Sequence, residues 1–361
     1  MNQDCFSSSY SEARNKFLES ANAAGANIHS YSRSDVCGLE GEPLCVDVAV
    51  IGREDATNAA IVITGTHGVE GFCGSAIVIQ WLRNHVNSVF SRDLKVVIVH
   101  AINPWAFSNM LRTTENNVDL NRNFISGPYE GNNPAHDPLF SLITSGEFTA
   151  SGSLTAFEQY NRFLEGQECG FENQLFEGQF HRPDGLYYAG SEAEWSNSTF
   201  RQIVRDHLSS AEKVGFIDWH TGIGKYGEVV LLVFDEVDNE AHDQAHLWWN
   251  RASNGRHSFS SGSIPEYRGL LCQSIGQELT TTKIAGAVVE FGTVDDFTLF
   301  RSDRIAVWLA KTDSNDPEYE AMRSDYRDVF YPRDNLWRRS VITEGPIYMD
   351  QLVHGILKWG K

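Results

Sequence analysis

The chain has 361 residues, and 29 Lys and Arg stand against 48 Asp and Glu, which gives a formal net charge of −19. A surface this acidic repels phosphate groups, so nucleic acids and anionic membranes are excluded as main partners. Hydrophobic residues make up 41% of the chain and charged residues 21%, as in a folded globular protein. The length predicts one large domain or two smaller ones, with a full hydrophobic core.

The sequence contains none of the usual targeting signals. Its apolar runs are short, and none approaches the roughly 20 residues that a membrane helix needs. The N-terminal segment lacks both a basic start and an apolar core, so no secretory signal is expected. The six cysteines are scattered without a C-x-x-C pair, which is typical of reduced thiols in a cytoplasmic protein.

Predicted strands and helices alternate along the chain. Short runs rich in Val and Ile predict buried strands, and longer polar segments between them predict helices. This alternation predicts an α/β fold with a mixed, mostly parallel sheet flanked by helices. The strands are expected at Val46–Ile51, Ala60–Thr64, Leu94–His100, Val214–Trp219, Val229–Phe234 and Ala287–Phe291. The helices are expected at residues 10–24, 74–84, 198–208, 242–250, 298–310 and 318–361, the last with breaks at Pro332 and Pro346.

Residues 127–213 differ from the rest of the chain. They are polar and rich in Gly, Asn, Pro and aromatic residues, with a turn signal at Arg182–Gly185. A helical piece is expected near Thr155–Leu164. We therefore predict a polar insertion or lid on the α/β core. Residues 179–185, which include His181, could lie over a site as part of that lid or form an ordinary turn.

The segment Thr64–Gly71, with the sequence TGTHGVEG, follows a predicted strand and precedes a predicted helix. Ligands of α/β sheets bind beyond the carboxyl ends of the strands. His67 and Glu70 stand three residues apart, and an imidazole and a carboxylate at this spacing can reach one Zn²⁺. The pair alone is a weak signal. The alternative is a loop histidine beside a glutamate that complements a helix dipole.

Two further predicted strands end in candidate site residues. His220 ends a strand in the sequence DWHTG, and Glu290 ends one in VVEFG. The alternatives are a buried histidine bonded to the backbone and a salt-bridged glutamate. A carboxylate that closes an apolar strand is costly unless it is paired or functional. Together with His67 and Glu70, these residues provide three candidate ligands and a carboxylate base, the composition of a catalytic zinc site.

A dense polar segment, Asn116–Asn123, has the sequence NNVDLNRN and follows Arg112. Guanidinium groups are suited to binding carboxylates because their donors match both oxygens. The segment is therefore a candidate for substrate binding. A hydrogen-bonded loop network is the alternative.

The motifs taken together resemble the zinc-carboxypeptidase superfamily. This superfamily includes the metallocarboxypeptidases and the succinylglutamate desuccinylase–aspartoacylase branch, and the likeness is greatest to a bacterial branch of unassigned activity. The resemblance implies a single α/β domain over residues 1–361, with an insertion at about 127–213. It implies one Zn²⁺ held by His67, Glu70 and His220, although other divalent metals could occupy such a site.

The resemblance also implies roles for the remaining motif residues. Glu290 would be the general base, and Arg112 would polarise the scissile carbonyl and stabilise the oxyanion. Asn121 and Arg122 would hold a substrate carboxylate, and Asp119 would orient the imidazole of His67. No motif identifies the tyrosine that many carboxypeptidases place near the substrate. The candidates are Tyr187, Tyr188, Tyr226 and Tyr267.

The implied activity is zinc-dependent hydrolysis of an amide bond near a free carboxylate, in a peptide or an N-acyl amino acid. A dication, Arg112 and Arg122 outweigh Glu70 and Glu290, so a net positive site and a small anionic substrate are expected. One alternative is an esterase or deacylase with the same site but no need for a substrate carboxylate. Another is a non-catalytic binding module that retains the fold.

Other histidines rank lower as site residues. His242 and His246 stand at the spacing of an H-E-x-x-H zinc motif, but Asp243 replaces the glutamate and the surroundings are acidic and solvated. His100, at the end of a predicted strand, is expected to be a packed core residue rather than a partner of a metal ligand. The sequence has no G-x-S-x-G elbow, P-loop or G-x-G-x-x-G motif, so serine-hydrolase, nucleoside-triphosphatase and dinucleotide-binding functions are disfavoured.

Overall fold

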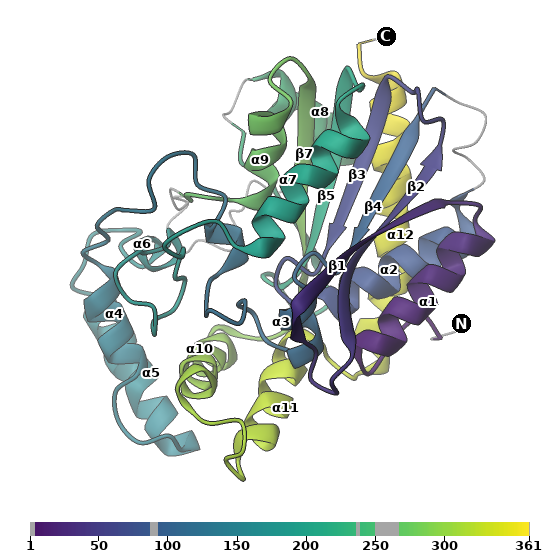
Figure 1. The fold of residues 1–361 in the computed structure, drawn as a ribbon. Helices are drawn as coiled ribbons and strands as arrows, with labels where there is room; N and C mark the ends of the chain where they lie inside the picture. Colours follow the sequence, from purple (N-terminus) through teal and green to yellow (C-terminus); the bar gives the residue numbers. More distant parts are fainter. Residues whose placement is uncertain (1–3, 87–92, 236–238, 250–266, 361) are drawn as a thin grey trace.

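The computed structural model describes residues 4–86, 93–235, 239–249 and 267–360. A seven-stranded sheet forms its centre, with helices on both faces (Figure 1). The strand order is β1-β2-β4-β3-β5-β7-β6. The central strands β4, β3, β5 and β7 pair in parallel, whereas β1, β2 and β6 join the sheet antiparallel. The predicted α/β class with a mixed sheet flanked by helices is confirmed.

All six predicted strands are present, and a seventh was not predicted. The additional strand, β1, lies at the edge of the sheet and is exposed or half-buried along most of its length. It has no apolar run for a sequence pattern to detect, because one face and one edge contact solvent. The strands are β1 (Asn27–Cys37), β2 (Pro43–Gly52), β3 (Asn58–Thr64), β4 (Lys95–His100), β5 (Lys213–Gly222), β6 (Val229–Leu232) and β7 (Lys283–Gly292).

The predicted helices are also present, but one of the two predicted helix breaks is absent. Pro332 separates α11 from α12 as predicted, but Pro346 lies inside α12, which continues through it. Asn250, the last residue of one predicted helix, lies outside the described residues. The helices are α1 (Tyr10–Ala23), α2 (Gly71–Asn84), α3 (Pro104–Asn109), the 3₁₀ helix η2 (Leu120–Arg122), α4 (His136–Ile143), α5 (Ala150–Leu164), α6 (Asn173–Phe176), α7 (Trp195–Leu208), α8 (Glu240–Trp249), α9 (Leu271–Glu278), α10 (Asp296–Lys311), α11 (Tyr319–Phe330) and α12 (Asn335–Lys358).

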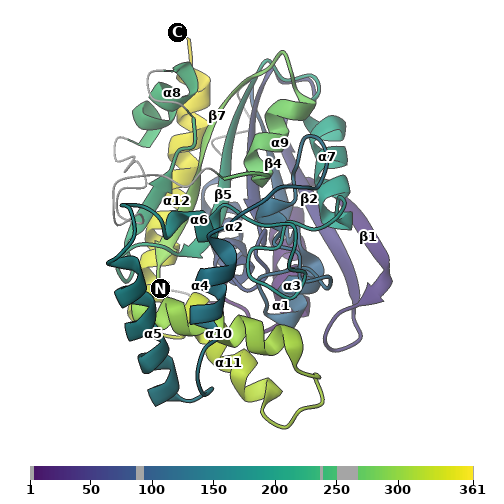
Figure 2. The same cartoon turned by 90° about the vertical axis from the view of Figure 1, so that its left-hand side faces the viewer.

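Each face of the sheet carries its own apolar core. Helices α1, α2, α8 and α12 cover one face, where the largest side chains are Trp81, Trp219, Trp249 and Trp337. Helices α7 and α9 cover the other face through residues such as Phe200. Figure 2 shows the two helix layers on either side of the sheet. Burial on both faces explains why the central strands read as continuous apolar runs.

The predicted insertion at residues 127–213 contains two structurally different parts. Helices α4, α5 and α6 pack with α10 in a separate apolar cluster beside the sheet (Figure 1). Helix α7 instead packs directly on the sheet. The six cysteines form no disulfide, as expected for reduced thiols. Among the described helices, none combines the length and apolar character needed to cross a membrane.

The register of the parallel strands brings three predicted site segments to one edge. Ile63 of β3 pairs with Asp218 of β5, and His220 of β5 pairs with Glu290 of β7. The segment with His67 and Glu70 follows β3 directly. The carboxyl ends of these strands therefore meet at the edge where α/β proteins bind ligands.

Candidate active site

The loop between β3 and α2 holds His67 and Glu70 in a tight turn against α3. Gly65 has a φ of +78°, a conformation that side chains with a Cβ disfavour. A Cβ at Gly68 would lie 2.0 Å from the carbonyl carbon of Ala106, so only glycine permits this approach. Glu70 then stands at the start of α2, and both it and His67 are buried.

Three predicted metal ligands converge at this loop. His67 Nδ1 lies 2.9 Å from Glu70 Oε1, and His220 Nδ1 lies 3.0 Å from Glu70 Oε2. The two Nδ1 atoms are 3.2 Å apart. Donors on a tetrahedral Zn²⁺, each at about 2.1 Å, are separated by roughly 3.4 Å. The spacing and the buried His₂Glu composition therefore fit a zinc ion.

Each histidine of this cluster presents its other ring nitrogen to a buried aspartate. His67 Nε2 lies 3.2 Å from Asp119 Oδ1, the residue to which the resemblance assigns the orientation of this imidazole. His220 Nε2 lies 3.0 Å from Asp218 Oδ2, a partner that sequence reasoning did not assign. A carboxylate at Nε2 fixes the proton there and leaves the Nδ1 lone pair free for a metal. For His67 this contact favours the tautomer that a metal ligand needs. His220 Nε2 and Asp218 Oδ2 are close enough for an ion pair, but the two atoms are not aligned as a hydrogen bond.

Glu70 is held by the backbone as well as by the histidines. Its Oε2 accepts a hydrogen bond from the Thr221 N–H at 3.0 Å, and Arg112 Nη1 lies 3.5 Å from its Oε1. Burial alone would raise the pKa of Glu70, but His67 and His220 outweigh burial and lower it. Burial likewise opposes charge on His220, yet the carboxylates of Asp218 and Glu70 raise its pKa well above the usual value. This field favours a cation among the three side chains.

Glu290 lies beside His220 on the adjacent strand and is buried. Its Oε2 accepts a long hydrogen bond, 3.4 Å, from the Ile223 N–H. Burial raises the pKa of Glu290 to about 8; the His220 charge opposes this shift and the Glu70 charge adds to it. A carboxylate whose pKa lies near neutrality is suited to taking and returning a proton.

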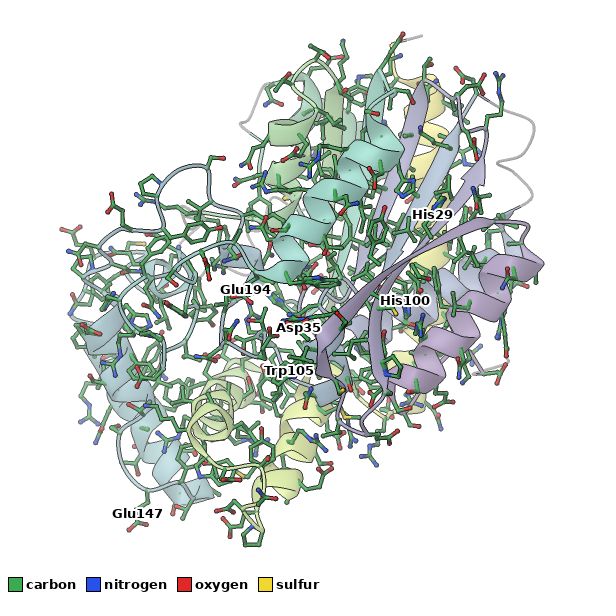
Figure 3. All side chains as sticks on the ribbon, in the orientation of Figure 1. His29, Asp35, His100, Trp105, Glu147 and Glu194 are labelled. Atoms are coloured by element: carbon green, nitrogen blue, oxygen red, sulfur yellow. The ribbon has the colours of Figure 1, made fainter. Side chains whose placement is uncertain are left out.

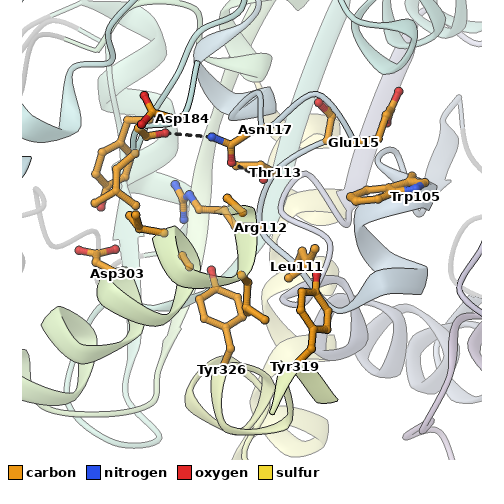
Figure 4. Close-up of a pocket in the computed structure, with 18 residues that line it drawn as sticks. Trp105, Leu111, Arg112, Thr113, Glu115, Asn117, Asp184, Asp303, Tyr319 and Tyr326 are labelled. Carbon is orange, nitrogen blue, oxygen red and sulfur yellow. Dashed lines mark hydrogen bonds between the residues drawn. The ribbon is translucent and has the colours of Figure 1, made fainter. Parts of the chain in front are cut away.

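Arg112 joins the cluster to a neighbouring pocket of about 170 Å³. Its Nε donates to Asp119 Oδ2 at 3.0 Å, so Asp119 links this guanidinium to His67. Burial alone would raise the pKa of Asp119, but Arg112 and Arg122 hold it well below its usual value. Figure 4 shows the Arg112 guanidinium pointing into the pocket, with the Tyr326 hydroxyl directed toward it and Asp303 on the opposite wall.

Asn121 and Arg122 belong to η2, which lies beside the cluster. Each side chain already forms hydrogen bonds with main-chain groups. Asn121 Oδ1 accepts from the Leu271 N–H at 2.9 Å, and Arg122 donates from Nε to the Phe176 carbonyl and from Nη1 to the Asn121 carbonyl. Asn121 Nδ2 and Arg122 Nη2 take no part in these three hydrogen bonds between described residues.

The four candidate tyrosines occupy different places. Tyr187 lies in the pocket, with the Arg112 and Arg122 guanidiniums 5.4 and 5.7 Å from its ring centre. Its φ of +52° is unusual for an aromatic residue, and such strain is concentrated at functional sites. Tyr267 stacks with Arg122 at 4.7 Å, whereas Tyr226 is 53% exposed. Tyr188 contributes its carbonyl, which accepts from the Asp119 N–H.

The charge expected for the site needs a correction. The site contains four buried carboxylates, because Asp119 and Asp218 lie beside the histidines in addition to Glu70 and Glu290. Their four negative charges equal the four positive charges of a dication, Arg112 and Arg122. With all four carboxylates ionised, the site with a dication is therefore formally neutral rather than positive. Any preference for an anionic substrate then depends on directed hydrogen bonds from individual donors, not on net charge.

The lower-ranked histidines have other surroundings. His100 is fully buried, stacks on Phe17 and lies 2.9 Å from Ser75 Oγ, so it is a core residue as expected (Figure 3). His242 and His246 stack on each other at 4.3 Å on α8. They do not belong to either of the two groups of described residues whose ligand atoms are close enough to share a metal. The second of these groups contains His136, Asp137 and His181.

Solved structures of other proteins are similar to this chain. The structure of thrombin-activatable fibrinolysis inhibitor aligns with a TM-score of 0.51 and 13% identity, over 97% of this chain and 74% of that one. The carboxypeptidase A from Helicoverpa armigera aligns with a TM-score of 0.48 and 13% identity, over 91% of this chain and 75% of that one. The succinylglutamate desuccinylase from Chromobacterium violaceum gives 0.38 and 12%, over 89% and 75%. At 13% identity, the first of these alignments shows a likeness of fold alone.

The sequence itself relates the chain to a family without an assigned activity. No curated protein has a significantly similar sequence. The family described as "Protein of unknown function (DUF2817)" matches residues 6–344, which is nearly the whole chain. The chain therefore belongs to the DUF2817 family, and its α/β fold is carboxypeptidase-like.

Proposed function

We propose that this protein is a zinc-dependent hydrolase that cleaves an amide bond near a free carboxylate, in a peptide or an N-acyl amino acid. The observation that carries the proposal is the convergence of His67 Nδ1, His220 Nδ1 and the Glu70 carboxylate at separations of 2.9 to 3.2 Å. Asp119 lies 3.2 Å and Asp218 lies 3.0 Å from the opposite ring nitrogens of His67 and His220, which supports binding of a cation at the two Nδ1 atoms. Three protein ligands leave the fourth position open, as in catalytic zinc sites.

Zinc held there would lower the pKa of water to about 7 and polarise the scissile carbonyl. Glu290 takes a proton from the attacking water and delivers it to the leaving nitrogen. Arg112 points into the adjacent pocket and donates to the oxygen on which negative charge develops. Asp119 keeps Arg112 oriented through its 3.0 Å bond to Nε.

Recognition of a substrate carboxylate is assigned to Asn121 Nδ2 and Arg122 Nη2. These donors lie next to Asp119 on η2 and are not used by the main-chain carbonyls that bind the rest of Arg122. The same observation favours a second candidate function. Because Nε and Nη1 of Arg122 already donate to main-chain carbonyls, the guanidinium cannot offer all its donors to a carboxylate. A deacylase or esterase without a carboxylate requirement therefore fits the site as well.

A substrate panel with two variants tests the proposal. Zinc-loaded wild type is assayed on peptides and N-acyl amino acids, each paired with an analogue in which the free carboxylate is an amide. We expect hydrolysis of the carboxylate forms, its loss in Glu290→Gln, and in Arg122→Ala a loss of kcat/KM confined to the carboxylate forms. Equal cleavage of both forms by wild type would support the second candidate. No hydrolysis of any pair by wild type would support a non-catalytic binding module.

A further inference from the structure

A second cluster of ligand side chains lies away from the active site, between α4 and the segment that follows α6. His136 and Asp137 begin α4, and His181 lies in the segment 179–187. His181 Nε2 is 3.3 Å from Asp137 Oδ1, and His136 Nδ1 is 3.7 Å from the same oxygen. One ligand atom from each of the three residues lies within 4.8 Å of the other two.

The orientation of His136 decides which of its ring nitrogens can bind a metal. The side chain is fully buried, and its Nε2 donates to the Leu186 carbonyl at 3.1 Å. A carbonyl only accepts, so the proton stays on Nε2 and the lone pair of Nδ1 faces the cluster. Within the described part of the chain, that buried Nδ1 has no hydrogen-bond partner. Two acceptors, Nδ1 and the Asp137 carboxylate, thus face each other.

We propose that His136, Asp137 and His181 form a second site for a divalent metal of the zinc class, separate from the active site. Two imidazoles and a carboxylate are ligands that Zn²⁺ prefers, and a ring N–H bonded to a backbone carbonyl is the usual support for a ligating histidine. The metal ties segment 179–187 to α4. Gly185 and Tyr187 of this segment line the pocket at Arg112, so the second metal fixes one wall of that pocket.

Arg182 sets the affinity of this site. Its Nη1 lies 3.5 Å from the Asp137 oxygen that the metal would use, and a guanidinium so close repels a second cation. Arg182 also pairs with Asp184 at 3.4 Å and stacks over Phe140 at 4.4 Å, so it keeps partners when the metal takes Asp137. Replacing Arg182 by a neutral residue should therefore tighten the metal.

Equilibrium dialysis against free Zn²⁺ with metal counting tests the proposal. Wild type should bind two zinc ions per chain, and His181→Ala and His220→Ala one each. The double variant should bind none. Because His181 is partly exposed, its replacement leaves the core intact. His354→Ala, at an exposed position on α12, is the matched histidine control and should keep two.

Two further results sharpen the test. In the His220→Ala background, Zn²⁺ should raise the Tm, and adding His181→Ala should abolish this rise. In the same background, Arg182→Gln should bind zinc at least threefold more tightly. Metal content that His181→Ala leaves unchanged would overturn the proposal, as would an equal loss in His354→Ala. The zinc bound to His220→Ala is counted without any activity assay. This test can therefore succeed or fail independently of the proposed function.

Discussion

Replacing Asp218 by asparagine tests how this protein prepares a metal ligand. Asp218 is fully buried; its Oδ1 accepts from Thr66 Oγ1 at 2.9 Å and its Oδ2 lies 3.0 Å from His220 Nε2. The asparagine of the Asp218→Asn variant can keep the bond from Thr66, but its amide then presents N–H groups to His220 Nε2. The imidazole must move its proton from Nε2 to Nδ1, the atom that faces Glu70. The variant thus changes the tautomer while nearly preserving shape.

The expected cost follows from the chemistry of such partners. Loss of a carboxylate behind a ligating histidine weakens metal binding about 10- to 100-fold, which corresponds to about 1.4 to 2.7 kcal/mol. Asp218→Asn should lie near the upper end, because metal binding at Nδ1 requires the proton on Nε2, where it would face the N–H groups of the amide. Competition for Zn²⁺ against a chromophoric chelator measures the change directly.

Asp243→Asn is the matched control for this experiment. Asp243 also stands beside a histidine, with its Oδ1 3.5 Å from His242 Nδ1, but it is 65% exposed on α8. Its replacement should leave zinc affinity within about twofold of wild type, because exposed pairs contribute little. Wild-type affinity in Asp218→Asn, with unchanged folding by circular dichroism, would refute the assigned role of Asp218. An equal loss in both variants would do the same.

Three other predictions concern the base, the core and the pocket. Glu290→Gln should lower kcat by about 10²- to 10⁴-fold without changing zinc content, which metal counting and steady-state kinetics check together. Burial lowers the pKa of His100 to about 4, so the unfolded chain binds the extra proton as pH falls. Up to about 3 kcal/mol of stability should then be lost between about pH 6.5 and 4. Urea unfolding at several pH values in this range gives the free energy of unfolding, which should fall less steeply with decreasing pH in His100→Gln than in wild type. Tyr187→Gly should relieve the strain at φ +52° yet raise KM, because it opens the pocket at Arg112; unchanged KM would argue against a substrate-facing role.

The central part of the fold was predictable because burial leaves a simple signal. Strands covered on both faces, such as β3 and β7, consist almost entirely of apolar residues, and a polar residue at their end stands out. Glu290 and His220 were found in this way. The edge strand β1 was not predicted, because its contact with solvent removes the apolar pattern that marks a strand.

Pro346 shows where tertiary packing overrides a local signal. A proline inside a helix costs about 3 kcal/mol and usually marks a break. In α12, Gly345 and Pro346 are buried, and a Cβ at Gly345 would lie 2.7 Å from Ile77 of α2. Close packing of α12 on α2 therefore holds the helix through the proline.

The residues that sequence reasoning missed act through contacts between distant segments. Asp218 stands two residues before His220, and strand alternation places both on one face of the sheet, so this spacing was the available signal. No pattern links Asp303 to Tyr187 and Arg112, because α10 reaches the pocket only through tertiary packing. The neutral total charge of the site was missed for the same reason.

Anomalous diffraction at the zinc edge, from crystals equilibrated with Zn²⁺, tests the central claim most directly. The account predicts a peak at about 2.0 to 2.2 Å from His67 Nδ1, His220 Nδ1 and a Glu70 oxygen, lost in crystals of His67→Ala. A structure without a peak among these three side chains, or with zinc bound elsewhere and none here, would contradict it.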